Sequence, residues 1–134
     1  MIVADSNLIA SCVLKSEATT AALALLERDP DWRVPRLWRY EMLNILSTMI
    51  KAKLLAKSDA ESTYRQLLEI LRVKEKDPEP SSVLSLVEQY GISGYDAQFV
   101  ALARDLDVKL YTQDKELLEK FPETAVKWFV RDAG

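Results

Sequence analysis

Short apolar runs alternate with longer stretches of helical periodicity along this chain, and that alternation limits the folds open to it. Ile2 and Val3 form the first apolar run, which stops at Asp5. Similar runs predict strands at residues 32–35, 108–112 and 125–130. Strands that alternate with helices are typical of α/β folds with a mostly parallel sheet. We therefore expect a three-layer α/β/α sandwich with a short, largely parallel sheet.

The stretches between these strands carry helix signals. Their periodicity predicts helices at residues 7–14, 16–28, 37–51, 58–71, 80–90, 93–105 and 114–120. Ser58 to Glu61 has the pattern of a capping box, and Gly91 is suited to ending a helix. Residues 73–77 are charged and bordered by proline, so a loop and a poor edge strand both stay open there. No repeat or linker interrupts the 134 residues, which predicts a single domain over residues 1–134.

The chain has no histidine and one cysteine, and these counts exclude several kinds of active site. A Ser-His-Asp or Cys-His nucleophile needs an imidazole, and a zinc site of Cys and His ligands needs more than one cysteine. An internal disulfide is also excluded. An enzyme built on this sequence must therefore use carboxylates, lysine, tyrosine, hydroxyls or a metal held by oxygen ligands.

Charge and targeting signals point to an ordinary cytoplasmic protein. The formal net charge is -3, so the overall charge gives no support for nucleic-acid binding. The first residues lack the basic and long apolar regions of a signal peptide. The apolar-rich, charge-free run at residues 42–50 is too short to cross a membrane. We expect no membrane partner.

Four acidic residues stand out against this pattern. Asp5 and Asp114 follow predicted strands, and the carboxyl ends of parallel strands form the ligand-binding edge of such sheets. Glu41 lies in an apolar helix, and Asp96 lies at the start of another. Each also has a purely structural explanation: Asp5 and Asp114 as helix caps, Glu41 on a solvent-facing side, and Asp96 in a capping box with Ser93.

The joint placement of the four acids favours a common site. Carboxylates brought together repel one another and raise each other's pKa unless a cation lies between them. Clustered oxygen ligands are what Mg²⁺ or Mn²⁺ requires. Such a site suits hydrolysis of a phosphodiester, because the metal polarises the phosphate and lowers the pKa of a water.

Four segments of the chain then resemble those of a known family. They are VADSN at residues 3–7, YEMLN at 40–44, YDAQFVALA at 95–103 and YTQD at 111–114. In their order and spacing they resemble PIN-domain ribonucleases, above all the short VapC-type toxins of toxin–antitoxin pairs. Residues 73–80 depart most from the family pattern.

The resemblance implies a site and an activity. It implies that Asp5, Glu41, Asp96 and Asp114 form a catalytic pocket for Mg²⁺ or Mn²⁺. Thr112 would support the pocket by hydrogen bonding, as would Ser6 or Asn7. The implied reaction is endonucleolytic cleavage of single-stranded RNA by metal-activated water. The implied partners are a second copy of the chain in a homodimer and an antitoxin that covers the site.

The chain is acidic overall, but outside the proposed pocket its charges are close to balanced, which is compatible with binding RNA. With the four proposed ligands set aside, 18 basic residues stand against 17 acidic ones. Arg36 and Arg39 lie near Trp32, Trp38 and Tyr40, and arginine with aromatic rings suits phosphates and unpaired bases. A solvated helix start with core aromatics explains the same residues.

Two other functions stay open at this stage. A receiver-like phosphoacceptor also gathers acids around Mg²⁺, although the aspartate and lysine that it needs after particular strands are not clear here. A catalytically silent PIN-like module that binds RNA or a partner protein is the principal alternative.

Overall fold

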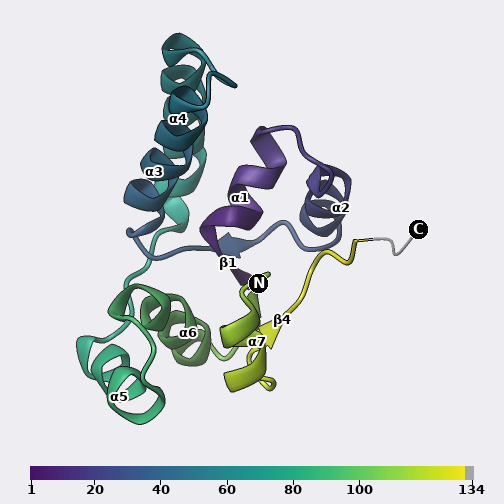
Figure 1. Ribbon diagram of the computed structural model, residues 1–134. Helices are drawn as coiled ribbons and strands as arrows, with labels where there is room; N and C mark the ends of the chain where they lie inside the picture. The colour runs from purple at the N-terminus through teal and green to yellow at the C-terminus, as the bar shows by residue number, and fades with distance from the viewer. Residues whose placement is uncertain (132–134) are drawn as a thin grey trace.

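A four-stranded parallel sheet lies at the centre of the computed structural model, which describes residues 1–131 (Figure 1). Its strands are β1 (Ile2–Ala4), β2 (Trp32–Arg33), β3 (Leu110–Tyr111) and β4 (Ala125–Val126). Their order is β2-β1-β3-β4, and all three ladders are parallel. Val3 in the central strand pairs with Arg33 on one side and Leu110 on the other. The largely parallel sheet expected from the sequence is confirmed.

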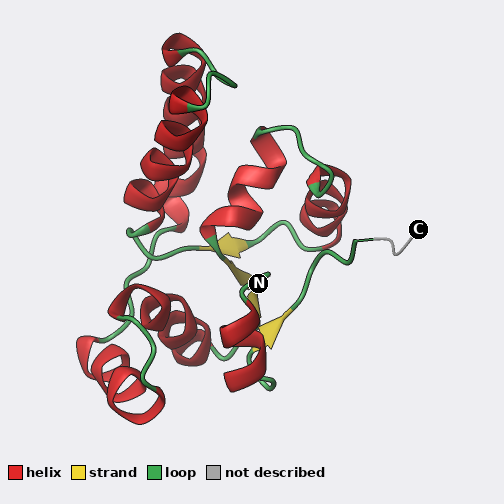
Figure 2. Cartoon of the chain, in the orientation of Figure 1, coloured by secondary structure: helices red, strands yellow, loops and turns green. Residues whose placement is uncertain are grey.

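Helices cover both faces of this sheet (Figure 2). They are α1 (Ser6–Val13), α2 (Thr19–Arg28), α3 (Trp38–Lys51), α4 (Lys57–Leu71), the 3₁₀ helix η1 (Arg72–Lys74), α5 (Pro80–Tyr90), α6 (Gly94–Leu106) and α7 (Lys115–Lys120). Side chains alternate across a strand, so Ile2 and Ala4 join one core cluster with α1–α4, and Val3 joins a second with α5–α7. These two cores give the three layers that the sequence predicts.

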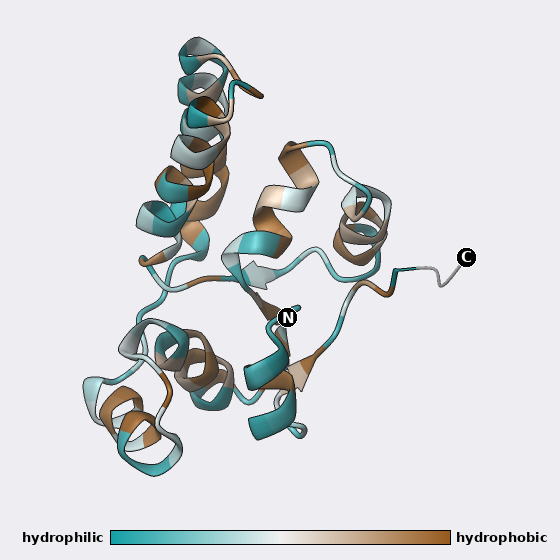
Figure 3. Ribbon diagram, in the orientation of Figure 1, coloured by the Kyte–Doolittle hydropathy of each residue, from teal (hydrophilic) through white to brown (hydrophobic). Residues whose placement is uncertain are grey.

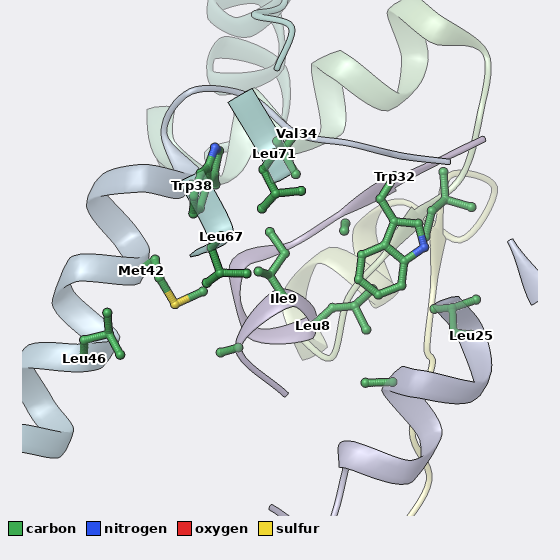
Figure 4. Close-up of a cluster of buried hydrophobic side chains, with 14 of the residues drawn as sticks. Leu8, Ile9, Leu25, Trp32, Val34, Trp38, Met42, Leu46, Leu67 and Leu71 are labelled. Carbon is green, nitrogen blue, oxygen red and sulfur yellow. The ribbon is translucent and has the colours of Figure 1, made fainter. Parts of the chain in front are cut away.

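The larger core explains the tryptophans near the start of α3. Trp32 and Trp38 are buried with leucines from α1, α2 and α4 (Figure 4). Burying a large apolar side chain contributes about 1.5–3 kcal/mol to folding. Both tryptophans therefore serve the core, and neither is exposed to stack on a base. The brown segments of α1, α2 and α3 in Figure 3 show the apolar surface that this core uses. Within residues 1–131, no helix combines the length and apolarity of a membrane span.

The structure decides one local question that the sequence left open and corrects one local prediction. Residues 73–77 contribute part of η1 and a single parallel bridge between Val34 and Glu75, not a regular edge strand. The reason is that Glu75 is held through its side chain. The capping box at Ser58 is wrong, because α4 begins one residue earlier and has Ala56 at its N-cap. Glu61 instead forms an i,i+4 ion pair with Lys57 at 3.6 Å.

Glu75 fastens this irregular segment to α3. Its carboxylate accepts a hydrogen bond from Trp38 Nε1 at 2.8 Å and two from the Arg39 guanidinium at 2.6 Å each. The Arg39 guanidinium holds the pKa of the Glu75 carboxyl below its usual range. These side-chain hydrogen bonds of Glu75 take the place of the backbone hydrogen bonds that a regular edge strand would have made.

Replacing Glu75 by alanine is therefore expected to destabilise the protein. The substitution leaves the buried Trp38 N–H without an acceptor, which costs about 1–3 kcal/mol. Urea denaturation at pH 7 measures the change. Glu88→Ala is a matched control, because Glu88 is exposed on α5 and its loss should change the free energy of unfolding by less than about 0.5 kcal/mol. Equal midpoints for the two variants would contradict the role given to Glu75.

Candidate active site

The carboxyl ends of β1 and β3 meet where the chain connections leave the sheet in opposite directions, the usual place for a ligand site in such sheets. Asp5 follows β1 and caps α1, accepting a hydrogen bond from Leu8 N–H at 2.8 Å. Thr112 follows β3, is completely buried, and donates to Asp5 Oδ2 at 2.7 Å. This hydrogen bond joins residues 107 positions apart.

Thr112 also positions the second strand-end acid. Its Oγ1 accepts a hydrogen bond from Asp114 N–H at 3.1 Å. Asp114 caps α7 by accepting from Leu117 N–H at 3.0 Å. The capping roles proposed for Asp5 and Asp114 are confirmed, and both residues also line the pocket described below. One threonine hydroxyl thus joins the carboxylate of Asp5 to the backbone N–H of Asp114, two acids that follow different strands.

The other two acids come from helices on opposite faces of the sheet. Glu41 lies in the first turn of α3 and accepts a hydrogen bond from Ser6 Oγ at 2.7 Å. It is half-buried, so its side of the helix does not simply face solvent. Asp96 lies in the first turn of α6, where its N–H donates to the capping Ser93 Oγ at 3.0 Å. Asp96 also lines the pocket described below, so its role in the cap does not exclude a role in the site.

A pocket of about 510 Å³ brings these elements together. Its lining contains all four predicted acids, and Ser6, Asn7 and Thr112 beside them. The remaining lining residues are Leu37, Tyr40, Asn44, Ile45, Tyr95, Phe99 and Leu117. No lysine or arginine is among these lining residues, so the negative charge is not neutralised from within the pocket wall.

The electrostatics reflect this imbalance. The pKa of Asp5 is raised from 3.8 to about 6, chiefly by burial and to a smaller extent by the charges of Glu41 and Asp114, while the hydrogen bonds from Thr112 and Leu8 lower it. Burial also raises the pKa of Glu41 and of Asp96, with Asp114 adding to the effect on Asp96. Ionised carboxylates are therefore costly here until a cation joins them.

The donor set fits a hard divalent cation. Carboxylate oxygens, with a hydroxyl and an amide beside them, are ligands that Mg²⁺ and Mn²⁺ favour over soft-metal alternatives. In residues 1–131, no three acidic or cysteine side chains are already close enough to form a finished metal-ligand cluster. The pocket therefore has donors of suitable chemistry, although they are not arranged as a finished ligand cluster.

The two arginines suggested as RNA contacts lie outside this pocket. Arg36 pairs with Asp77 at 2.8 Å, and Arg39 pairs with Glu75. Both line a neighbouring hollow that shares Leu37 and Tyr40 with the pocket. They remain candidates for binding RNA beside the reaction site, and both already have a structural role.

Two exposed tyrosines at the pocket complete the site. Tyr40 is 69% exposed and Tyr95 is 66% exposed, although both line the pocket. Tyr40 comes directly before Glu41, and Tyr95 comes directly before Asp96. Both tyrosines open segments that resemble the family, but neither was predicted to line the pocket. An aromatic residue directly before each helical carboxylate was the available signal.

Comparison with known proteins agrees with this fold. Residues 2–124 match the PIN domain, so the chain belongs to the PIN-domain family. It is 29% identical over 124 residues to Ribonuclease VapC3 of Pyrobaculum aerophilum, covering 90% of this chain and 95% of that protein.

Solved structures share the fold at lower identity. PAE2754 from Pyrobaculum aerophilum superposes with a TM-score of 0.73 and 22% identity, covering 94% of this chain and 89% of that one. A chain of VapBC2 from Rickettsia felis, solved with a DNA fragment from its promoter, gives a TM-score of 0.66 and 18% identity. That match covers 96% of this chain and 100% of the other.

Proposed function

We propose that this protein is a Mg²⁺- or Mn²⁺-dependent endoribonuclease that cleaves single-stranded RNA, and that it is the toxin of a toxin–antitoxin pair. One observation carries the enzymatic part. Four carboxylates from four separate segments line one pocket whose wall contributes no cationic side chain. The similarity to Ribonuclease VapC3 supports the choice of RNA among phosphodiesters.

The proposed division of work follows from the hydrogen bonds. Asp5, Glu41, Asp96 and Asp114 would hold the cation. When bound, it would polarise the phosphate and lower the pKa of the attacking water. Thr112 and Leu8 N–H each engage one oxygen of Asp5, which fixes the carboxylate plane. Ser6 holds Glu41 by one hydrogen bond to Oε1, and Asn7 adds an exposed amide at the pocket.

The pocket rim favours an unpaired strand as the substrate. Tyr40 and Tyr95 present exposed rings beside the carboxylates. Unpaired bases stack on such rings with about 1–3 kcal/mol per base, whereas the bases of a duplex are already stacked within it. An RNA substrate places the proposed activity in the cytoplasm.

The proposed partners are an antitoxin that covers the pocket and a second copy of the chain. Their support is the family resemblance together with an open groove of about 730 Å³ between α3 and α4. Leu43 and Ile50 lie in this groove and stay exposed, whereas Leu67 and Leu71 of α4 belong to the core. Light scattering on the purified chain distinguishes monomer from dimer.

Removal of divalent metal is expected to stop RNA cleavage. A fluorescently labelled unstructured RNA is incubated with the protein and Mn²⁺, then with EDTA, then with Mn²⁺ restored. We expect cleavage in the first and third conditions and loss to background in the second, because the pocket wall has no cation of its own to stabilise the phosphate.

The same assay separates the alternatives. Cleavage that persists in EDTA would overturn the metal-dependent mechanism. RNA binding without cleavage under Mg²⁺ or Mn²⁺ would instead identify a catalytically silent PIN-like module. A duplex of the same sequence is the control for the preference for an unpaired strand.

A further inference from the structure

The acidic pocket has no lysine or arginine in its lining with which to neutralise the phosphates of a bound RNA strand. A phosphodiester backbone carries a negative charge at every nucleotide, and most of the affinity for nucleic acid comes from cations that meet those charges. A metal ion in the pocket neutralises charge only at the reacting phosphate. The phosphates on either side need positive charge elsewhere on the surface.

Two adjoining hollows supply that charge. The first, of about 450 Å³, shares Leu37 and Tyr40 with the acidic pocket and is lined by Arg36 and Arg39. The second, of about 340 Å³, shares Arg39 with the first. Its other lining residues are Arg65, Leu68, Glu69 and Arg72. Each hollow therefore shares at least one lining residue with the next, from the carboxylates to the C-terminal half of α4.

Local geometry explains why the arginines gather there. Arg65 lies on α4, and Arg72 is the C-cap residue directly after that helix, seven positions later and about two turns along the same side. The hairpin of α3 and α4 brings the start of α3 beside the end of α4, as Figure 1 shows, and Arg39 joins them there. Four arginines, 36, 39, 65 and 72, make up this arginine patch.

Arg36, Arg65 and Arg72 are available to an anion, whereas Arg39 is held by Glu75. Arg65 and Arg72 are exposed, and neither forms an ion pair with any residue in 1–131. Arg65 also lines the groove between α3 and α4, so a protein partner bound there would compete with RNA for it. Glu69 lies between them on the same side of α4. Arg36 pairs with Asp77, but their side chains are 69% and 40% exposed, and exposed pairs hold weakly enough for a phosphate to compete.

We infer that the arginine patch binds the backbone phosphates of the RNA strand on one side of the cleavage site. Tyr40 lies at the wall between the acidic pocket and the first hollow, where a base can stack as the strand passes. The inference rests on the proposed ribonuclease function and adds a course for the substrate. Arg65 and Arg72 act on affinity and not on the chemical step.

The test measures binding and cleavage separately. Anisotropy of a labelled, unstructured RNA is measured with Asp96→Asn, which removes a proposed ligand and so allows binding without cleavage. Arg65→Gln and Arg72→Gln are added together in the same background. We expect affinity to fall by roughly tenfold, and the slope of log affinity against log salt to decrease in magnitude by about 1.4, because two single-strand phosphate contacts are lost.

A matched control removes the same charge elsewhere. Arg28→Gln with Lys127→Gln alters two exposed cations that line none of the three hollows. This pair is expected to change RNA affinity by less than threefold. In the otherwise wild-type chain, the Arg65 and Arg72 substitutions should raise KM and leave kcat within about twofold, since they do not touch the reacting phosphate.

The outcomes distinguish this inference from the function on which it rests. Suppose that the wild-type chain cleaves RNA and the Asp96→Asn chain binds it. If the Arg65 and Arg72 substitutions then change RNA affinity no more than the control pair does, the RNA path proposed here is wrong. If the patch variant keeps its RNA affinity but loses binding to a labelled polyglutamate peptide, the patch serves a protein partner, which also overturns the inference. If no variant binds RNA, the proposed ribonuclease function itself fails.

Discussion

Replacing Asp5 by asparagine is expected to lower RNA cleavage by at least 100-fold while leaving the protein folded. The substitution removes one of the proposed cation ligands, and the loss of several kcal/mol of transition-state stabilisation corresponds to a change of roughly this size. Asparagine caps a helix about as well as aspartate, so α1 keeps its start. Mn²⁺ should raise the melting temperature of the parent and leave that of the variant unchanged.

The same substitution is expected to stabilise the metal-free protein near pH 8. The pKa of Asp5 is raised in the folded state from 3.8 to about 6, so its contribution to stability is fully present below 3.8 and is lost as the pH rises through 6. Asparagine carries no charge, and it should therefore add about 1–2 kcal/mol at pH 8, after allowance for its partial exposure and altered hydrogen bonding. Little difference is expected below pH 4.

Urea denaturation in EDTA at pH 4 and pH 8 measures this dependence. Asp59→Asn is the matched control, because Asp59 is exposed in the first turn of α4 and lines none of the hollows. It should retain full cleavage and gain no stability at pH 8. Full activity in Asp5→Asn would remove Asp5 from the catalytic set, and equal stability changes at both pH values would contradict the proposed cost of its charge.

Replacing Thr112 by valine is the second change with a large expected effect. Valine keeps the shape of threonine but has no hydroxyl, so Asp5 Oδ2 and Asp114 N–H each lose a partner. Loss of such supporting hydrogen bonds typically costs 10- to 100-fold in metal affinity or activity. The unpaired buried groups should also lower the free energy of unfolding by about 1–3 kcal/mol.

Thr112→Ser separates the hydroxyl from the packing of its methyl group. The serine variant should recover most of the Mn²⁺ affinity, while it keeps a packing defect that valine does not have. The hydrogen bond from Thr112 lowers the pKa of Asp5, so its loss in Thr112→Val should move the acid limb of the pH–rate profile to higher pH. An unchanged profile in Thr112→Val would show that the hydroxyl does not act through Asp5.

Most of the fold follows from signals that operate within a few residues. Ile2 and Val3 are apolar on both sides of the strand, which already requires helices on both faces of a parallel sheet. Gly91 ends α5 with a φ of 68°, as its position in the sequence predicts. The segment at residues 73–77 was not predictable in this way, because Glu75 is held by the distant Trp38 and Arg39.

The candidate site likewise contains some residues that local signals predict and others whose placement depends on contacts between distant segments. Asp5 and Asp114 were found because the ends of parallel strands have a predictable neighbourhood. The hydrogen bond between Ser6 and Glu41 and the rim made with Tyr95 depend on how α1, α3 and α6 approach one another, which no local pattern encodes. The arginine patch could not be predicted, because it forms only where the start of α3 meets the end of α4. In the sequence alone, Arg65 and Arg72 look like ordinary solvated residues.

The long reach of the Thr112 to Asp5 hydrogen bond has a consequence for synthesis of the chain. A ribosome that has made the first hundred residues has produced Asp5, Glu41 and Asp96, but not the threonine that orients Asp5 or the fourth acid that follows it. The pocket described above is complete only once the strand at Leu110–Tyr111 has been released and paired. The candidate site is thus incomplete during most of the chain's own translation, because the hydrogen bond that orients Asp5 forms last.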